Sequence, residues 1–285
     1  YFCNAKGKDK AKHVVFIGLD GWGAYSLPKA DMPNVKKLME DGSYTLKKRS
    51  ALPSSSAINW ASMFMGAGPE LHGYTEWGSK TPELPSRVLN KNGIFPTVFQ
   101  LLRDARPEAE IGCLYEWEGI KYLVDTLSLN YHYHVADCNK TPKELGNMAS
   151  AYIKEKHPAL VAICYDGPDH TGHTEGHDTP AYYEKLKELD IYVGQIVQAV
   201  KDAGILDDTI FILTSDHGGI DKGHGGKTMQ EMETAFIISG KNIKKGLRFD
   251  DVSMMQYDVA STIASIFNLE QPQVWIGRPM KIVFK

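Results

Sequence analysis

The sequence predicts an α/β fold in which a mostly parallel central sheet carries helices on both faces. Three short apolar runs, His13 to Leu19, Ala159 to Tyr165 and Thr209 to Thr214, are rich in β-branched residues, and each ends in a polar loop. Such runs are typical of strands buried on both faces. Segments with helical periodicity lie between them, and strands that alternate with helices indicate a parallel sheet. With 285 residues, of which 42% are hydrophobic, the chain can bury one sizeable core, and we expect one domain over residues 1–285.

Five further segments have the apolar spacing of helices. They are Pro33 to Glu40, Ile58 to Met65, Phe95 to Arg103, Lys143 to Lys154 and Ala181 to Ala203. Glycine follows the second and the last of them, as is common where a helix ends. Towards the C-terminus, Tyr257 to Phe267 has the pattern of an amphipathic helix and Trp275 to Lys285 that of a terminal strand. Residues 115–139 are rich in Tyr, His and Trp and break the alternation, so we expect an insertion or a cap near the functional site.

The bulk composition argues against several classes of partner. The formal net charge is −3 and the isoelectric point is near 6.4, whereas nucleic acids and anionic membranes attract basic surfaces. The sequence therefore indicates no nucleic-acid-binding surface, and an anionic substrate has to be held locally. No run of about 18 apolar residues occurs, so we expect no transmembrane segment within these residues.

Cysteine usage and the first residues bear on the compartment. Cys3, Cys113, Cys138 and Cys164 lie far apart and lack the CxxC spacing of a zinc site. Dispersed buried thiols are the favoured interpretation, with one disulfide in an oxidising compartment as the alternative. The chain begins Tyr1-Phe2-Cys3 without a methionine, which fits a mature product that has lost its targeting segment. We therefore expect a secreted or periplasmic protein.

Acidic and imidazole side chains follow each of the three predicted strands. They are Asp20 after the first strand, Asp169 and His173 after the second, and Asp216, His217 and His224 after the third. Ligands of open α/β sheets bind beyond the carboxyl ends of the strands, where these side chains converge. Carboxylate and imidazole donors together suit Zn²⁺ and also accept Mn²⁺. Two divalent ions about 4 Å apart suit phosphoryl transfer, because they share the charge of the phosphoryl group. The sequence therefore predicts a site for two divalent ions.

Each of these residues also has an ordinary structural interpretation. An Asp before Gly at a strand end is more often a turn residue than a ligand, and a single His in a glycine-rich loop is more often merely exposed. The convergence of three Asp and three His favours the metal site. Spacing alone leaves His177 and Asp166, in the same loop as Asp169, open as ligands.

The candidate nucleophile is Ser56, which stands just before the predicted helix at Ile58 to Met65. A hydroxyl there faces unpaired backbone N–H groups and the positive end of the helix dipole, where an anion is stabilised. A metal ion would lower its pKa further and permit attack on phosphorus. The alternative is that Ser56 only caps the helix, since serine is a favoured N-cap residue.

Five motifs resemble, in the same order, those of the type I phosphodiesterase/nucleotide pyrophosphatase family of the alkaline phosphatase superfamily. They are Ile17-Gly18-Leu19-Asp20-Gly21, the segment Ser56 to Gly73, Pro168-Asp169-x-x-Gly172-His173, Ser215-Asp216-His217-Gly218 and Gly223-His224-Gly225. The resemblance covers about residues 13–240 and implies a three-layer alkaline-phosphatase-like sandwich.

The resemblance also implies roles for the candidate residues. One zinc ion would be held by Asp169, His173 and His224, and a second by Asp20, Asp216 and His217. Ser56, at the position of the family's usual threonine nucleophile, would act as nucleophile and metal ligand.

Substrate contacts are less well matched. The family context Thr-Phe-Pro-Asn reads Ser56-Ala57-Ile58-Asn59 here, which makes Asn59 a candidate substrate-binding residue. Many family members bind a phosphoryl oxygen with an asparagine shortly after the His-Gly pair, and Trp77 stands at that position. Lys80 is a candidate replacement for this donor, although a loop lysine is usually just exposed. Trp77 is a candidate for stacking on a nucleobase, or a packing residue.

We therefore expect metal-dependent hydrolysis of phosphodiesters or nucleotide pyrophosphates through a phosphoseryl intermediate on Ser56. A phosphomonoesterase or a sulfatase on the same scaffold is the first alternative. No sulfatase-type Cys/Ser-x-Pro-x-Arg string surrounds Ser56, and no arginine stands in the motif loops to clamp a phosphate dianion. The alternative of another class is a metal-dependent binding protein without catalysis.

Overall fold

A single eight-stranded sheet forms the centre of the computed structural model, which describes residues 7–135 and 142–285. The strand order is β4-β3-β5-β1-β6-β7-β2-β8. In chain order the strands are β1 (His13–Leu19), β2 (Gly42–Arg49), β3 (Ile111–Tyr115), β4 (Tyr131–His134), β5 (Leu160–Tyr165), β6 (Thr209–Thr214), β7 (Glu233–Gly240) and β8 (Leu247–Arg248). Among these strands only β7 runs antiparallel to its neighbours. The predicted mostly parallel sheet is confirmed.

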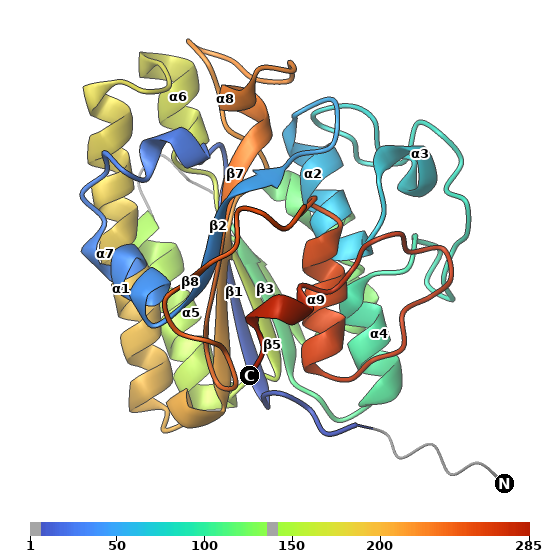
Figure 1. Ribbon diagram of the computed structural model, residues 1–285. Coiled ribbons are helices and arrows are strands. Elements are labelled where there is room, and N and C mark those ends of the chain that lie inside the picture. The colour runs from blue at the N-terminus through green and yellow to red at the C-terminus, as the bar shows by residue number, and fades with distance from the viewer. Residues whose placement is uncertain (1–6, 136–141) are drawn as a thin grey trace, which may run out of the picture.

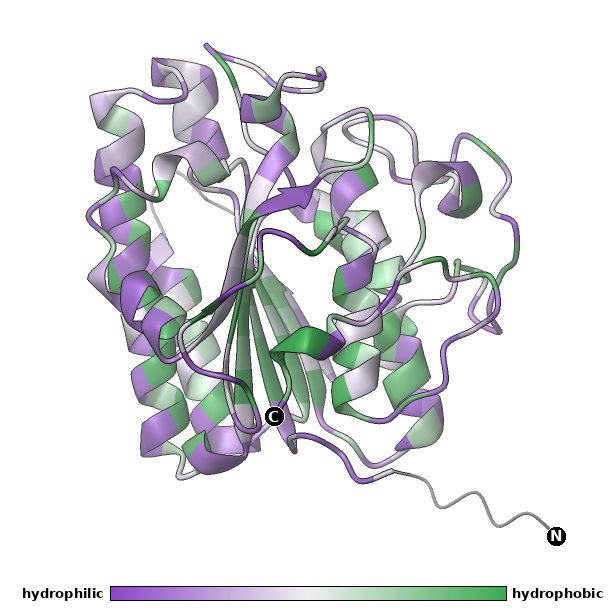
Figure 2. Cartoon of the chain, in the orientation of Figure 1, coloured by the Kyte–Doolittle hydropathy of each residue, from purple (hydrophilic) through white to green (hydrophobic). Residues whose placement is uncertain are grey.

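Helices cover both faces of the sheet and complete three layers (Figure 1). One face carries α1 (Pro33–Glu40), α5 (Pro142–Lys156) and α7 (Pro180–Asp202), and the other carries α2 (Ser56–Met65), α4 (Val98–Ala105) and α9 (Asp258–Ile266). The strands between them are largely apolar, whereas the helices carry hydrophilic residues on their outer sides (Figure 2). The shorter helices are α3 (Pro69–His72), α6 (Asp169–Glu175) and α8 (Met229–Met232).

Strand β1 connects the two halves of the core, because its side chains alternate between the faces of the sheet. Val14 and Phe16 pack in the core beneath α2, α4 and α9, whereas Val15 and Ile17 pack in the core beneath α1, α5 and α7. All four are buried. This two-sided burial explains why β1 has a continuous apolar sequence rather than alternating polar and apolar residues.

The predicted helices occur within a few residues of their expected bounds, and local chemistry explains the shifts. Helix α4 begins at Val98 because Thr97 is its N-cap residue and accepts a hydrogen bond from the backbone N–H of Gln100 at 3.1 Å. The sequence patterns did not predict strands β2, β3, β4, β7 and β8.

Among the described residues, no helix has both the length and the apolar character needed to cross a membrane.

The predicted terminal strand at Trp275 to Lys285 is wrong. This segment contains a short 3₁₀ helix at Lys281–Val283 and only one isolated bridge, between Phe284 and Ile243. Two of its backbone N–H groups bond to side chains of α9: Met280 N donates to Thr262 Oγ1 at 3.0 Å, and Arg278 N donates to Asp258 Oδ1 at 2.8 Å. Those of Ile276 and Gly277 donate to the carbonyl of Gly66.

Residues 115–139, expected to form an insertion or a cap, supply parts of the sheet and of its edge. They contain the last residue of β3, two 3₁₀ helices at Glu118–Tyr122 and Thr126–Ser128, and the edge strand β4. Residues 136–139 lie outside the described residues, as do Cys3 and Cys138. Cys113 and Cys164 are buried free thiols, in agreement with the favoured interpretation for these two.

Two side chains, Trp60 and Glu116, brace the strand ends at which the acidic residues lie. Trp60 of α2 packs on the backbone of Gly18 in β1, where an added Cβ would lie 2.3 Å from the indole ring. The same indole Nε1 donates to Asp20 Oδ2 at 3.0 Å. Glu116, directly after β3, accepts a hydrogen bond from the backbone N–H of Asp166, directly after β5, at 2.8 Å. Burial raises the pKa of Glu116 to about 8.

Gly18→Ala should displace Trp60 and, with it, the hydrogen bond to Asp20. Because the clash falls on a ring enclosed in the core, we expect a loss of about 1–3 kcal/mol in the free energy of unfolding. Denaturant unfolding of the variant and of the wild type measures this difference. An unchanged midpoint would show that Trp60 is not held in place by this contact.

Glu116→Gln should stabilise the protein in a pH-dependent way, because glutamine keeps the acceptor for Asp166 N but cannot ionise. The wild-type carboxyl has a folded-state pKa of about 8, above the ordinary value of roughly 4.3 for the unfolded chain. The wild type therefore loses stability relative to the variant as pH rises from about 4.5 to 8, and the difference is constant above that. Thermal unfolding of both proteins across this range checks the trend, and a pH-independent difference would contradict it.

Candidate active site

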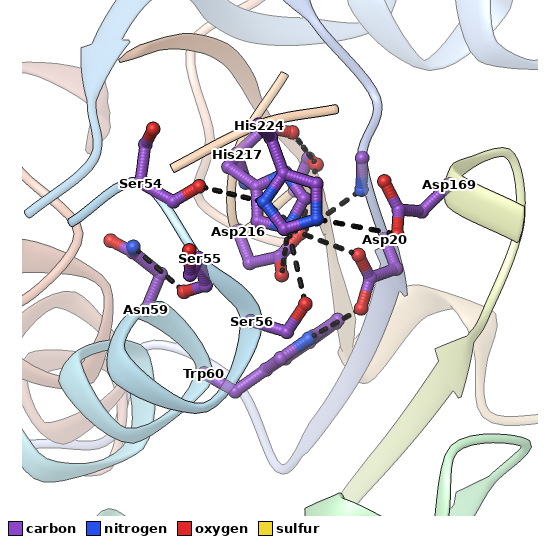
Figure 3. A network of polar contacts seen from close by, with 12 residues as sticks. Asp20, Ser54, Ser55, Ser56, Asn59, Trp60, Asp169, Asp216, His217 and His224 are labelled. Atoms are coloured by element: carbon purple, nitrogen blue, oxygen red, sulfur yellow. Dashed lines mark hydrogen bonds and ion pairs between the residues drawn. The ribbon is translucent and has the colours of Figure 1, made fainter. Parts of the chain in front are cut away.

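Ser56 lies at the first turn of α2 and faces His217 (Figure 3). Its Oγ lies 3.1 Å from His217 Nε2, and the residue is 7% exposed. The N-cap residue of α2 is Ser55, so the alternative in which Ser56 only caps the helix is wrong. The hydroxyl stands at the positive end of a ten-residue helix, where negative charge on oxygen is stabilised. The geometry therefore suits Ser56 to the role of a nucleophile.

A first group of donors consists of Asp169, His173 and His224. Their ligand atoms all lie within 4.8 Å of one another. His173 Nε2 lies 3.0 Å from Asp169 Oδ2 and 3.2 Å from His224 Nε2. The remaining ring nitrogens bond to backbone carbonyls: Nδ1 of His173 to Lys222 O at 2.9 Å, and Nδ1 of His224 to Ser54 O at 3.0 Å. Both Nε2 atoms are thereby directed at the same point, as in imidazole ligands of a metal.

A second group gathers around His217. Its Nε2 lies 3.3 Å from Asp20 Oδ1 and 3.2 Å from Asp216 Oδ2, while its Nδ1 lies 2.7 Å from Gly218 O. Asp169 joins this group, because its carboxylate also lies within 4.8 Å of the ligand atoms of Asp20 and His217. The rings of His217 and His224 stack with centroids 3.7 Å apart, which brings the two groups side by side. The structure thus brings together all seven residues predicted for the metal site.

The buried carboxylates repel one another, and their ionisation reflects it. Burial, together with Asp216 and Asp169, raises the pKa of Asp20 well above its ordinary value. Burial and Asp169 raise the pKa of Asp216 to about 7. Burial also lowers the pKa of His217 to about 3, so its imidazole is neutral at pH 7 and can offer a lone pair.

Asp169 behaves differently because it is surrounded by imidazoles. Although burial opposes ionisation, hydrogen bonds to His173, His177 and His224 lower the pKa of Asp169 well below its ordinary value. The same contact raises the pKa of His173 to about 9. A proton on His173 lies where a cation bound to Asp169 would displace it.

The hydrogen bonding of two carboxylate oxygens indicates whether the site fits a cation. Asp20 Oδ1 and Asp216 Oδ2 are buried and make no hydrogen bond, although each lies near His217 Nε2, at 3.3 and 3.2 Å. The other oxygen of each is bonded: Asp20 Oδ2 accepts from Trp60, and Asp216 Oδ1 accepts from the backbone N–H groups of Gly21 and His217 at 3.1 and 2.9 Å. Buried acceptors without partners are costly. A donor set of carboxylate and neutral imidazole with two such oxygens fits a divalent ion.

His177 is a site residue whose role the sequence left open. It is buried, and its Nε2 lies 3.3 Å from Asp169 Oδ1, whereas His173 and His224 lie near the other oxygen, Oδ2. Its ring is enclosed by Gly172 and Gly219, where an added Cβ would lie 2.3 and 2.2 Å from it. His177 therefore orients Asp169. The Asp-x-x-x-His spacing that indicated His173 does not predict this contact. His177 follows the end of α6, and only the folded chain brings its ring back to Asp169.

A cavity of about 170 Å³ opens beside Ser56. Its lining residues are Asp20, Ser56, Trp77, Trp117, Asp166, Asp169, His170, His173 and His224. Among these residues Trp77 was predicted as a substrate contact, and it is 68% exposed at the mouth. Trp117 and His170 were not singled out from the sequence. Asp166 lies outside both donor groups, which disfavours it as a ligand.

Two other predicted substrate contacts are placed differently. Asn59 is fully buried, and its side-chain amide bonds to Ala51, Pro53 and Ser55. It holds the loop before α2 and has no donor left for a substrate, so its prediction as a substrate-binding residue is corrected. Lys80 is exposed, lies over the ring of Tyr122 at 5.7 Å, and is not among the residues that line the cavity.

Comparisons with known proteins place the chain in a family. The family model described as type I phosphodiesterase / nucleotide pyrophosphatase matches residues 14–240. The bis(5'-adenosyl)-triphosphatase enpp4 of Mus musculus is 26% identical over 219 residues, covering 73% of this chain and 47% of the relative. The GPI ethanolamine phosphate transferase 3 of Schizosaccharomyces pombe is 30% identical over 122 residues, 42% of this chain and 13% of the relative. The chain thus spans at most about half the length of these two relatives.

Solved structures support the fold. An inactive form of murine ectonucleotide pyrophosphatase / phosphodiesterase 5, in complex with AMP, superposes with a TM-score of 0.73 at 15% identity, covering 92% of this chain and 96% of that chain. A 2-O GAG sulfatase reaches a TM-score of 0.75 at 14% identity, with 95% and 73% covered. The predicted alkaline-phosphatase-like sandwich is confirmed by these neighbours. The family match over most of the sequence identifies the chain as a member of the type I phosphodiesterase / nucleotide pyrophosphatase family, a family of phosphoric ester hydrolases.

Proposed function

We propose that the protein hydrolyses phosphodiesters or nucleotide pyrophosphates with Ser56 as nucleophile and two divalent ions, Zn²⁺ or Mn²⁺, as cofactors. The observation that carries the proposal is the position of Ser56 Oγ, 3.1 Å from His217 Nε2, beside two groups of carboxylate and imidazole donors. A hydroxyl at a helix N-terminus next to such donors is the arrangement that phosphoryl transfer requires.

The residues divide between the two ions as the family resemblance implies. Asp169, His173 and His224 would hold one ion, and Asp20, Asp216 and His217 the other, with Ser56 at the second group. Bound ions would stabilise the negative charge that develops on the phosphoryl oxygens and on the attacking and leaving oxygens. In support, the two orphaned oxygens, of Asp20 and Asp216, belong to the second group.

The chain's own residues support a two-step displacement. Ser56 Oγ, deprotonated, attacks phosphorus, so that an Oγ–P bond forms while the bond from phosphorus to the ester oxygen of the leaving group breaks. The N-terminus of α2 stabilises the charge on Oγ before the attack. Water then cleaves the Oγ–P bond, which releases the phosphate product and restores the hydroxyl of Ser56.

The cavity lining favours a diester over a monoester. None of the lining residues of the described chain is Lys or Arg, whereas a phosphate dianion benefits from a bidentate cationic clamp. The neighbour solved with AMP and the triphosphatase name of the mouse relative support a nucleotide substrate. Trp77, exposed at the mouth of the cavity, offers an apolar surface for the base of such a substrate.

The predicted location outside the cytoplasm stays a prediction.

Ser56→Ala should abolish turnover. Because the variant lacks the attacking oxygen, we expect hydrolysis of bis(4-nitrophenyl) phosphate to fall by on the order of 10³-fold or more with the fold intact. Ser55→Ala is the matched control: its side chain makes no cap hydrogen bond, and most activity should remain. Turnover by Ser56→Ala within tenfold of the wild-type rate would refute the assignment of Ser56 as the nucleophile.

Removal of divalent ions should inactivate the enzyme reversibly. After dialysis against a chelator we expect loss of diesterase activity, and recovery when Zn²⁺ or Mn²⁺ is added back, with about two ions per chain by elemental analysis. The same holoprotein is assayed on a phosphodiester, a phosphomonoester and a sulfate ester. Preference for the sulfate ester would favour the sulfatase alternative, and failure on all three by metal-replete protein would favour a binding protein.

A further inference from the structure

Lys48 is a lysine buried without an ion pair behind the second donor group. It is 0% exposed, and none of the described carboxylates lies within ion-pair distance of its Nζ. Nζ donates to the backbone carbonyl of Ser215 at 2.8 Å and to Oε1 of Gln256, and lies 3.9 Å from the sulfur of Met63. A buried ammonium is costly unless hydrogen bonds compensate for lost water. Its presence at this place therefore calls for an explanation.

A β-bulge directs Lys48 inward. In the antiparallel pairing of β2 with β7, Thr45 lies opposite Phe236 and Lys48 opposite Thr234, so β2 contains one extra residue between the two pairs. Without that residue, Lys47 rather than Lys48 would share the face of Thr45. With it, Lys47 is exposed and Lys48 points between α2 and the segment before α9. Bulges are over-represented next to active sites, where they re-aim a side chain.

The target of Lys48 is the loop that carries two of the metal-site residues. Gln256 Nε2 donates to the carbonyl of Asp216 and, at 3.2 Å, to that of Ser215, while Ser50 Oγ donates to the carbonyl of Asp216 at 2.7 Å. The consecutive carbonyls of Ser215 and Asp216 are thus both held from behind. On the other side of this backbone, the N–H of His217 donates to Asp216 Oδ1 at 2.9 Å. Holding this backbone therefore also holds the carboxylate of Asp216, and it sets the position from which the side chain of His217 extends.

We propose that Lys48, acting with Gln256, is a positioning residue that holds the backbone of residues 215–217, so that Asp216 and His217 present their ligand atoms before an ion arrives. The inference rests on the proposed two-ion function. A preorganised ligand pair binds more tightly than one that must be ordered on binding, and outer contacts of metal sites typically change affinity by about 10–100-fold. Lys48 thereby sets the affinity of the second group, while the first group stands on α6 and the His224 loop.

The decisive experiment measures zinc binding rather than activity alone. Lys48→Met keeps a side chain of similar length without donors, and Lys47→Met is its matched control, one residue along on the exposed face. For holoprotein titrated stepwise with a chelator, we expect the weaker-bound ion of Lys48→Met to be lost at about 10–100-fold higher free zinc than in the wild type. The affinity for the other ion should remain within about twofold of the wild-type value, and excess zinc should restore turnover.

The outcomes separate the two proposals. If the wild type binds two ions and Lys48→Met binds both with unchanged affinity, or loses both equally, Lys48 is only a core residue and the inference is overturned. If the wild type binds no ions, the proposed function falls and the inference falls with it. Lys47→Met should bind as the wild type does, and an equal effect there would also contradict a role specific to Lys48.

Gln256→Glu covers the case in which Lys48→Met does not fold. Glutamate keeps the acceptor for Lys48 Nζ and adds an ion pair, but it removes the donor to the carbonyls of Ser215 and Asp216. The variant should remain folded and show the same selective weakening of one ion by about 10–100-fold. A folded Gln256→Glu with two ions bound at wild-type affinity would overturn the inference.

Discussion

Three buried carboxylates, those of Asp20, Asp169 and Asp216, meet at the carboxyl edge of the sheet, and their mutual repulsion is the constraint on which the rest of the site depends. Burial and proximity raise the pKa of Asp20 and of Asp216, whereas three imidazoles hold Asp169 ionised. Such a concentration of negative charge is stable only if protons or cations neutralise it. The histidines around it are therefore part of the same electrostatic unit.

The scaffold holds this unit from several directions. Trp60 donates a hydrogen bond to Asp20 from α2, and His177 contacts Oδ1 of Asp169. Lys48 and Gln256 hold the backbone of Ser215 and Asp216. None of these residues belongs to the six donors, yet each fixes one of them. The arrangement follows a general feature of metal sites, in which outer contacts orient the ligands and limit their motion.

Much of the fold and the donor set could be predicted because they rest on local patterns. The apolar runs that became β1, β5 and β6 end in polar loops, and such loops meet wherever parallel strands share an edge. Strand β7 is equally apolar but antiparallel, so no site residue marks its end, and it was not predicted. The expected strand at Trp275 to Lys285 is wrong because side chains of α9 and the carbonyl of Gly66 accept hydrogen bonds from several of its backbone N–H groups, a competition that no local pattern reveals.

The sequence by itself determined which atoms can do chemistry here: the acids, the imidazoles, and a serine at the start of a helix, each in a motif of short range. Only the tertiary structure decided how they are used. It made Ser55 the cap and left Ser56 facing His217, it turned the amide of Asn59 into the loop, and it brought His177 and Lys48 to their sites. The physical reason is that strand order, strand register and one bulge determine which distant residues come within hydrogen-bonding distance. These are properties of the packed sheet and not of any local segment.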